Sequence, residues 1–237
     1  AVSTQIVITA NSKTEVYSGQ AVTDSGHTYT GKLADGDKLE VEVVGSQTDK
    51  GSSKNWFTYT LTEGTKADNY TITQEYGELV VTKNTSVINI TAKSANKTYD
   101  GQALTEPRYD FTQNILAEGD VLTAVVEGSQ TDAGSSANVV KSYRVMRGDE
   151  DVTANYIFDD SVDGTLTVTK RKVTLTSGTA CKIYDGKYLT CNKVEVGGDG
   201  FVEGEGATYD VTGKRKDIGW SYNDFTYKLN DNTKADN

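Results

Sequence analysis

The chain has 237 residues, of which 24 are Lys or Arg and 34 are Asp or Glu, so its formal net charge is −10. A charge of this sign repels polyanions, so we expect neither a nucleic-acid partner nor an anionic lipid surface. No stretch approaches the roughly 20 apolar residues of a membrane span, so no membrane insertion is expected. One histidine, His27, and two cysteines leave little material for His-based catalysis or a Cys/His metal cage, and we expect no cofactor and no metal.

The composition predicts an all-β protein. There are 14 tyrosines and 23 glycines but a single proline, and threonine and valine are abundant throughout. Branched and flat side chains pack well on a pleated surface, whereas Gly, Asp and Asn supply the turns between strands. Long windows with apolar residues at helical spacing are absent.

The first part of the chain is expected to form six or seven strands. Alternation is clearest at Asn55–Thr62, where Phe57, Tyr59 and Leu61 share one face and Trp56 lies with threonines on the other. The other expected strands are Ile6–Thr9, a segment around Tyr17, His27–Thr30, Leu39–Val44, Tyr70–Thr73 and Leu79–Thr82. Turn signals every eight to twelve residues favour an immunoglobulin-like β-sandwich. A β-grasp fold is the alternative, weakened because no segment reads as its helix.

Four sequence landmarks recur along the chain in a fixed order. A Tyr-x-Gly motif at Tyr17, Tyr99 and Tyr184 returns after 82 and then 85 residues. The second landmark is Gly-Ser-Gln-Thr-Asp-x-Gly-Ser-Ser at 45–53 and 128–136, with a weaker copy at 213–221. The third is Ala-Asn-Tyr-like text at 67–70, 153–156 and 235–237. The fourth is Gly-x-Leu-x-Val-Thr-Lys at 77–83 and 164–170. The chain is therefore predicted to consist of three tandem β repeats, at residues 1–84, 85–171 and 172–237.

The third predicted repeat stops at the third landmark. By analogy, the text that follows would be Tyr-x-Ile-x and then Gly-x-Leu-x-Val. Either its last strands are trimmed, or the repeat boundaries are offset from the physical domains. A unit of about 85 residues can bury a modest core of its own.

These landmarks resemble the YDG-type (MBG) repeats of large bacterial surface proteins, and the resemblance covers essentially the whole chain. It implies a secreted, wall-attached protein of a Gram-positive or gut bacterium. Such repeats occur in stalks and in adhesins for mucins, matrix proteins or immunoglobulins, and the immunoglobulin-binding, superantigen-like surface proteins of gut Firmicutes have comparable tandem modules. The resemblance implies no catalytic constellation, so we expect no enzyme.

Two functions follow from this resemblance. In the first, a monomeric extracellular binding module recognises a host glycoprotein, with immunoglobulin and mucin as the leading candidates. In the second, structural spacer repeats project a distant domain from the cell wall. Exposed aromatic residues that break the repeat pattern favour binding, because a spacer has no reason to keep them in water. The candidates are Trp56, Tyr109, Phe111, Trp220 and Tyr222, with Tyr109 and Phe111 expected in a loop.

The third repeat is predicted to be the most specialised for recognition, because it alone has a cysteine pair and the basic run Lys214–Lys216. Cys181 and Cys191 are ten residues apart, which fits neither a Cys-x-x-Cys motif nor a zinc pair. A local disulfide is favoured and would indicate an extracellular compartment, with two free thiols as the alternative.

Other motifs are interpreted as structural. The recurring tyrosines Tyr17, Tyr99 and Tyr184 are interpreted as core or corner residues that set the first turn of each repeat. Acidic pairs around glycine do not fit a calcium loop and are expected to be solvated turns. They are Asp35–Asp37, Glu118–Asp120, Asp149–Asp151 and Glu203–Glu205.

Two further motifs have only weak support. The integrin-like tripeptide Arg147-Gly148-Asp149 is expected in an exposed hairpin loop and is interpreted as fortuitous. Isopeptide bonds between Lys83 or Lys170 and Asn69 or Asn155 are conceivable, but the sequence cannot place the required groups together.

Overall fold

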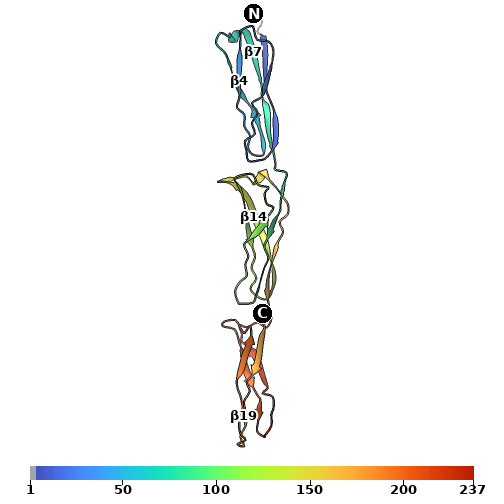
Figure 1. The fold of residues 1–237 in the computed structure, drawn as a ribbon, viewed down its shortest axis with the longest axis vertical. Helices are drawn as coiled ribbons and strands as arrows, with labels where there is room; N and C mark the ends of the chain where they lie inside the picture. The colour runs from blue at the N-terminus through green and yellow to red at the C-terminus, as the bar shows by residue number, and fades with distance from the viewer. Residues whose placement is uncertain (1–3) are drawn as a thin grey trace. The chain divides into compact units, whose positions relative to one another are not determined.

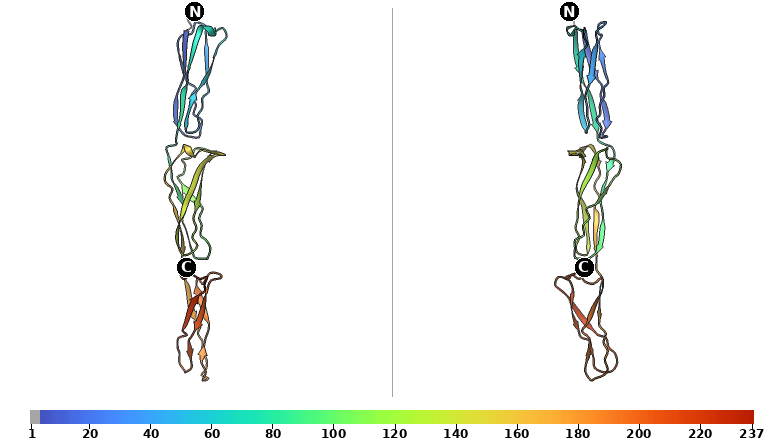
Figure 2. Two further views of the ribbon diagram at one scale, coloured as in Figure 1. Left: turned by 180° about the vertical axis from the view of Figure 1, so that it is seen from behind. Right: turned by 60° about the vertical axis from the view of Figure 1, so that its left-hand side comes forward.

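The computed structural model describes residues 4–237 and confirms the all-β prediction. Its strands run from β1 to β23, with two short 3-10 helices, η1 (Ala67–Asn69) and η2 (Thr153–Asn155), and no α-helix in that range. Strands joined by loops make up most of the described part of the chain in each view (Figures 1 and 2). None of the helices in residues 4–237 is long and apolar enough to cross a membrane.

The chain divides into two compact units. Unit 1 comprises the chain up to residue 91 with residues 110–125 and 141–162, and unit 2 comprises residues 92–109, 126–140 and 163–237. Both units therefore include part of the second predicted repeat. The boundaries at 84/85 and 171/172 stay a prediction, and "repeat 1", "repeat 2" and "repeat 3" denote below the predicted ranges 1–84, 85–171 and 172–237.

Repeat 1 contains three small sheets. Strand β1 (Thr4–Ala10) lies between β3 (His27–Thr30) and β7 (Tyr70–Glu75), and β8 (Gly77–Thr82) lies between β2 (Lys13–Val16) and β5 (Gly51–Asn55). The third sheet pairs β4 (Leu39–Val43) with β6 (Phe57–Leu61), both visible in the blue-to-cyan part of Figure 1. β7 runs parallel to β1, and β8 runs parallel to β2 but antiparallel to β5.

The period of two in the sequence decides which side chains of repeat 1 are inside. In β6 burial alternates as predicted, with Phe57 buried and its threonine neighbours exposed. Ile6, Ile8, Ala10 and Phe57 form the buried cluster, against which half-buried residues of β4 and β7 pack. Leu79 and Val81 of β8 are buried as well, so the last two strands of the repeat contribute directly to its interior.

Repeat 2 places its strands in the same register. β17 (Gly164–Thr169) runs parallel to β11 (Ala95–Thr98) and antiparallel to β14 (Gly134–Arg147), with Leu166 opposite both Ala95 and Ser136. β14 and β13 (Asp120–Glu127) are long enough to belong to both units, and β14 ends in a hairpin with β15 (Glu150–Asp151). The remaining pairs are β16 (Ile157–Phe158) with β9 (Val87–Ile88), and β10 (Ile90–Ala92) with β12 (Tyr109–Phe111).

Repeat 3 has fewer strands and no buried hydrophobic side chain. Its pairs are β18 (Val173–Ser177) with β20 (Val194–Gly198), β19 (Leu189–Thr190) with β22 (Lys214–Arg215), and β21 (Ala207–Val211) with β23 (Phe225–Leu229). All of residues 172–237 are described, and Gly206 alone among them is buried. In the first two repeats, by contrast, hydrophobic side chains from several strands are buried.

Candidate functional site

The clearest concentration of buried polar chemistry in unit 1 lies around Tyr17. Its hydroxyl donates to Oδ2 of Asp120 at 2.9 Å and accepts from Nη2 of Arg147 at 2.8 Å. Nε of Arg147 donates to the other Asp120 oxygen, Oδ1, at 2.8 Å, and its Nη1 donates to the carbonyl of Gly19 at 3.0 Å. The Asp120 side chain is fully buried and that of Arg147 is 25% exposed.

A second tyrosine completes this group, which we call junction 1 (Tyr17, Asp120, Arg147 and Tyr156). The Tyr156 hydroxyl donates to Oδ2 of Asp120 at 2.5 Å and accepts from the backbone N–H of Ala117 at 2.9 Å. The two tyrosine rings meet edge to face at 5.4 Å between centroids. Each carboxylate oxygen of Asp120 thus accepts at least one donor, which is how a buried carboxylate avoids the cost of desolvation.

The electrostatics of junction 1 favour neutral phenols. Burial raises the pKa of Tyr17 to about 12, and the nearby Asp120 carboxylate acts in the same direction. Burial also raises the pKa of Tyr156, again with Asp120 as a contributor. Both hydroxyls are thus held as neutral donors to one carboxylate, which joins the side chains of the junction.

Next to junction 1, the side-chain amide of Asn155 makes two hydrogen bonds, which we call the amide clasp. Nδ2 of Asn155 donates to Oδ1 of Asp49 at 2.7 Å, and Oδ1 of Asn155 accepts from the backbone N–H of Lys50 at 2.8 Å. Asp49 and Lys50 belong to the Gly-Ser-Gln-Thr-Asp landmark of repeat 1, whereas Asn155 belongs to the Ala-Asn-Tyr landmark of repeat 2. The side chain of Asn155 in repeat 2 is therefore hydrogen-bonded to two consecutive residues of repeat 1, Asp49 and Lys50.

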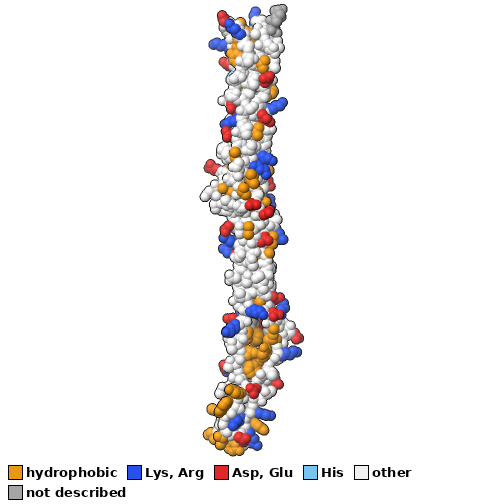
Figure 3. Space-filling model, turned by 90° about the vertical axis from the view of Figure 1, so that its right-hand side faces the viewer, with side chains coloured by type: hydrophobic (Ala, Val, Ile, Leu, Met, Phe, Trp, Pro, Cys, Tyr) orange, Lys and Arg blue, Asp and Glu red, His pale blue; other side chains and the backbone are white. Residues whose placement is uncertain are grey.

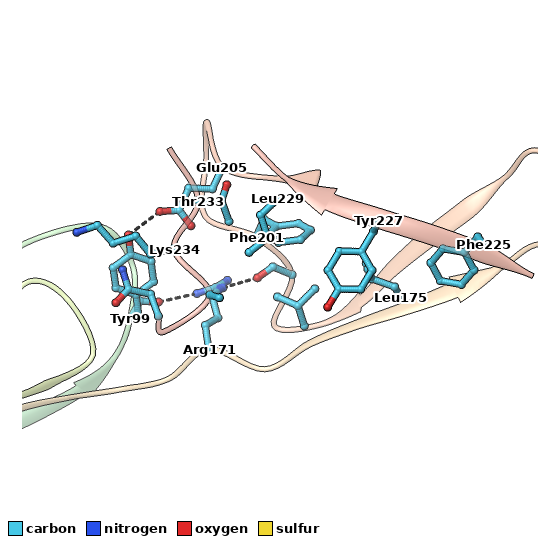
Figure 4. A pocket seen from close by; sticks show the side chains of 14 residues that line it. Tyr99, Arg171, Leu175, Phe201, Glu205, Phe225, Tyr227, Leu229, Thr233 and Lys234 are labelled. Carbon is cyan, nitrogen blue, oxygen red and sulfur yellow. Dashed lines mark hydrogen bonds between the residues drawn. The ribbon is translucent and has the colours of Figure 1, made fainter. Parts of the chain in front are cut away.

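Unit 2 contains the corresponding group, junction 2 (Tyr99, Glu205, Arg171 and Asn237). The Tyr99 hydroxyl donates to Oε1 of Glu205 at 2.6 Å, which raises the pKa of Tyr99. Arg171 donates from Nη1 to the Tyr99 carbonyl at 3.1 Å and from Nε to the Gly200 carbonyl at 2.7 Å (Figure 4). Asn237 forms the matching clasp, from Nδ2 to Asp132 at 2.9 Å and from the N–H of Ala133 to its Oδ1 at 2.8 Å.

The sequence interpretation of these residues was partly wrong. Tyr17 and Tyr99 are buried as predicted, whereas Tyr184 is 58% exposed, which the core interpretation did not predict. The hydroxyls of Tyr17 and Tyr99 bond to carboxylates 103 and 106 residues away rather than only setting a local turn. Asp120, predicted to lie in a solvated turn, is buried. The signal that could have found these partners is a carboxylate that follows glycine at matching places, at Asp37, Asp120 and Glu205.

A third recurring contact lies inside each repeat. Nδ2 of Asn55 donates to the carbonyls of Asn11 and Asp24, both at 2.9 Å. Asn138 makes the same pair of bonds to Lys93 and Glu106, and Asn223 makes it to Gly178 and Cys191. The sequence analysis did not single out these asparagines, although they stand at the same offset after the Gly-Ser-Gln-Thr-Asp landmark.

The predicted aromatic candidates are distributed over both compact units. Trp56 lies between β5 and β6 and is 50% exposed, as the alternation predicts, at the position where Val139 and Asp224 stand in the other repeats. Tyr109 and Phe111 lie in strand β12 and are half-buried, so the prediction of a loop was wrong. Trp220 and Tyr222 are 74% and 77% exposed and meet edge to face at 5.4 Å.

Two further predictions need correction. Cys181 and Cys191 are free thiols, the first exposed and the second half-buried, so the favoured disulfide is not formed. Arg147 is not displayed in an open loop, because its guanidinium is engaged in junction 1 at the end of β14. The Arg-Gly-Asp tripeptide is therefore not presented as a free unit. Among residues 4–237 no group of three or more His, Cys, Asp or Glu side chains could hold a metal ion.

Comparison with protein-family models finds no match to the chain, and comparison with curated proteins finds none either. The resemblance to YDG-type repeats therefore rests on the motifs themselves.

Proposed function

We propose that the chain is a non-catalytic spacer segment of a bacterial surface protein, made of three tandem immunoglobulin-like β-sandwich repeats of the YDG type. The observation that supports this best is the tyrosine–carboxylate contact that occurs twice, as Tyr17 with Asp120 in unit 1 and Tyr99 with Glu205 in unit 2.

Each contact joins residues of consecutive predicted repeats, 103 and 106 residues apart, and lies within a compact unit. Opening junction 1 between repeats 1 and 2 would take the Tyr17 hydroxyl from Asp120 and Arg147, and the Asn155 amide from Asp49 and Lys50, while Asp120 keeps Arg147 and Tyr156 within repeat 2. Each polar group left without its partner costs free energy. Such a junction resists hinge motion between consecutive repeats. A spacer must resist bending, whereas independent binding modules in tandem do not require a stiff connection.

The cellular location is part of the same proposal. The resemblance supports a secreted, wall-attached protein, and an acidic, monomeric, non-catalytic chain suits that setting. The free thiols of Cys181 and Cys191 remove the support that a disulfide would have added for an extracellular compartment.

The test is whether the two sides of junction 1 tumble together. Backbone ¹⁵N relaxation of the full chain should give one common rotational correlation time for residues 4–82 and for residues 110–125 and 141–162. In the Asp120→Ala variant, the two sets should separate. Two distinct correlation times in the unaltered chain would mean that the junction does not couple the repeats, and the spacer proposal would fail.

Recognition of a host glycoprotein is the second candidate, and Trp56 is the observation that favours it. A half-exposed indole between two strands, next to the exposed threonines of β6, is the kind of residue that dominates binding interfaces. The test is capture of immunoglobulin from serum or mucin from mucus by the full chain. Loss of capture in Trp56→Thr, with a matched Trp220→Thr control unaffected, would support this site, and no capture from either fluid would dismiss it.

A further inference from the structure

An early strand and the last strand of repeat 1 are paired with each other. β2 runs parallel to β8 over four residue pairs, from Lys13 opposite Leu79 to Val16 opposite Thr82. The hydrogen bonding continues one residue further, because the backbone N–H of Tyr17 donates to the carbonyl of Thr82 at 2.9 Å. We call this set of bonds ladder 1. It ends at the tyrosine whose hydroxyl lies in junction 1.

Repeat 2 contains the same arrangement, ladder 2. β11 runs parallel to β17 over four residue pairs, from Ala95 opposite Leu166 to Thr98 opposite Thr169. The backbone N–H of Tyr99 donates to the carbonyl of Thr169, again at 2.9 Å. Ladder 1 lies in unit 1 and ladder 2 lies in unit 2. The parallel pairing of an early strand with the last strand is therefore a property of each of these repeats by itself.

Both ladders lie beside buried side chains. Leu79 and Val81 of β8 are at most 2% exposed, and so are Leu166 and Val168 of β17. On the face shown in Figure 3, the hydrophobic side chains of repeat 1, at the top, form only small separate groups. Hydrogen bonds next to a packed interior are electrostatically stronger than hydrogen bonds in water. The interior of each repeat therefore supports its ladder.

The order of the strands decides how tension along the chain acts on ladder 1. β2 comes early in repeat 1, whereas β8 is its last strand, and the chain continues from Thr82 into repeat 2. Tension therefore pulls β2 towards its N-terminus and β8 towards its C-terminus. Because the two strands are parallel, these pulls are opposed along one axis and slide the strands past each other. All hydrogen bonds of the ladder are then stretched together rather than one after another.

The strand before β2 is paired in the same sense. β1 runs parallel to β7 over six residue pairs, from Thr4 opposite Tyr70 to Thr9 opposite Glu75. β7 is followed by β8 after a single residue. A pull that enters repeat 1 through β1 therefore also acts along a pair of parallel strands before it reaches ladder 1.

We propose that ladders 1 and 2 are force clamps, which hold repeats 1 and 2 folded while the chain carries tension. Unfolding under force is governed by the rate of unfolding, and a set of bonds that must break together makes that rate slow. The proposal deepens the spacer function and rests on it for the source of the tension. Each clamp acts inside one repeat, so it does not require junction 1 to couple the repeats.

The experiment changes the direction of the load and leaves β2 and β8 unaltered. The full chain carries Cys181→Ser and Cys191→Ser, so that its own thiols do not react with the handles. Handles are attached through Ser12→Cys and Lys83→Cys, at opposite ends of ladder 1, or through Ser18→Cys and Lys83→Cys, at the same end. All three attachment positions are exposed. At the same constant force, repeat 1 should unfold at least ten-fold more slowly with the opposite-end handles, because only they load all bonds of the ladder together.

A matched pair of proline variants tests the bonds themselves, with the opposite-end handles. The N–H of Tyr17 faces β8, and the N–H groups of a strand point alternately to its two sides. The N–H of Glu15 therefore also faces β8, whereas that of Thr14 faces away from it. Proline removes the N–H, and β2 is an edge strand, where proline is tolerated. Glu15→Pro should speed unfolding about ten-fold, the effect of one lost hydrogen bond, and the control Thr14→Pro should change the rate little.

Each comparison can overturn the proposal. Equal unfolding rates for the two handle geometries would show that ladder 1 is not a force clamp, and this comparison decides even where Glu15→Pro prevents the ladder from forming. Equal rates for Glu15→Pro and Thr14→Pro would show that other contacts set the rate. Replacement of Ser12 removes its bond to the N–H of Glu78, which works against the expected result. Because both handles lie in repeat 1, this test and the tumbling test of junction 1 fail independently.

Discussion

Tyr17 and Asp120 are 103 residues apart in sequence, yet the phenol hydroxyl donates to the buried carboxylate at 2.9 Å. The same carboxylate holds Arg147 and Tyr156, so four side chains from three distant stretches share one set of hydrogen bonds. Glu205 has the corresponding role for Tyr99. In both cases the acid lies directly after a glycine in a turn, which places its carboxylate within reach of the tyrosine hydroxyl.

Removal of the Asp120 carboxylate should destabilise unit 1. Breaking a buried ion pair costs about 3–5 kcal/mol, and because Arg147 is 25% exposed we expect Asp120→Ala to cost about 1–3 kcal/mol. Urea unfolding followed by Trp56 fluorescence, in a Trp220→Phe background, measures the change. Asp149→Asn, an exposed carboxylate near the same hairpin, is the control. Equal midpoints for both variants would contradict the role assigned to Asp120.

Junction 1 should weaken at high pH. The folded-state pKa of Tyr17 is raised to about 12 from an ordinary value near 10, so its contribution to stability is fully present below pH 10 and is lost as the pH rises towards 12. Absorbance at 295 nm should show a late-titrating component that becomes smaller in Tyr17→Phe, with Tyr156 contributing to what remains. If the titration curve of Tyr17→Phe keeps that component unchanged, the late titration belongs to another tyrosine.

A methyl group on Gly45 should disturb the hydrogen bonds that the Asn55 side chain makes to the carbonyls of Asn11 and Asp24. A Cβ there would lie 2.3 Å from Oδ1 and 2.6 Å from Cα of Asn55, so the backbone or the side chain must move. We expect Gly45→Ala to cost about 1–3 kcal/mol, the usual range for overpacking. In Gly197→Ala the nearest atom is 3.8 Å away, and little change is expected. Thermal unfolding followed by circular dichroism compares the two, and similar shifts would argue against close packing at Gly45.

The carboxyl of Glu106 should titrate unusually low. Arg108 donates to it from Nε at 2.8 Å and from its backbone N–H at 3.1 Å, and these bonds lower the pKa of Glu106 to about 2. Stability from this pair is present above pH 4.5 and is lost as the pH falls towards 2. A ¹³C NMR titration of the side-chain carboxyl should show the pKa return towards 4.5 in Arg108→Gln. An unchanged pKa in that variant would remove the guanidinium as the cause.

Both cysteines should react as thiols without prior reduction. Cys181 is exposed and Cys191 is half-buried, so a thiol reagent should titrate two groups, with Cys181 the faster. Cys181→Ser and Cys191→Ser assign the two rates. If no thiol reacts before a reductant is added, a disulfide is present and the free state described above is wrong.

The sequence by itself determined the strand content and the faces of the strands. Alternation at Phe57, Tyr59 and Leu61 predicted which side of β6 is inside, because side chains of a strand point to opposite faces with a period of two. The recurring landmarks also located Tyr17 and Tyr99 correctly as buried residues. These are local properties, and a local pattern is sufficient to predict them.

Only the tertiary structure decided which side chains that are far apart in the sequence form hydrogen bonds with one another. Asp120 and Glu205 read as solvated turn residues in the sequence, because nothing local distinguishes a carboxylate that faces water from one that accepts a hydroxyl more than 100 residues away. Likewise the sequence did not reveal that the rings of Trp220 and Tyr222 meet edge to face at 5.4 Å. Pairing across long loops is set by packing, and packing becomes visible only when the strands are placed beside one another.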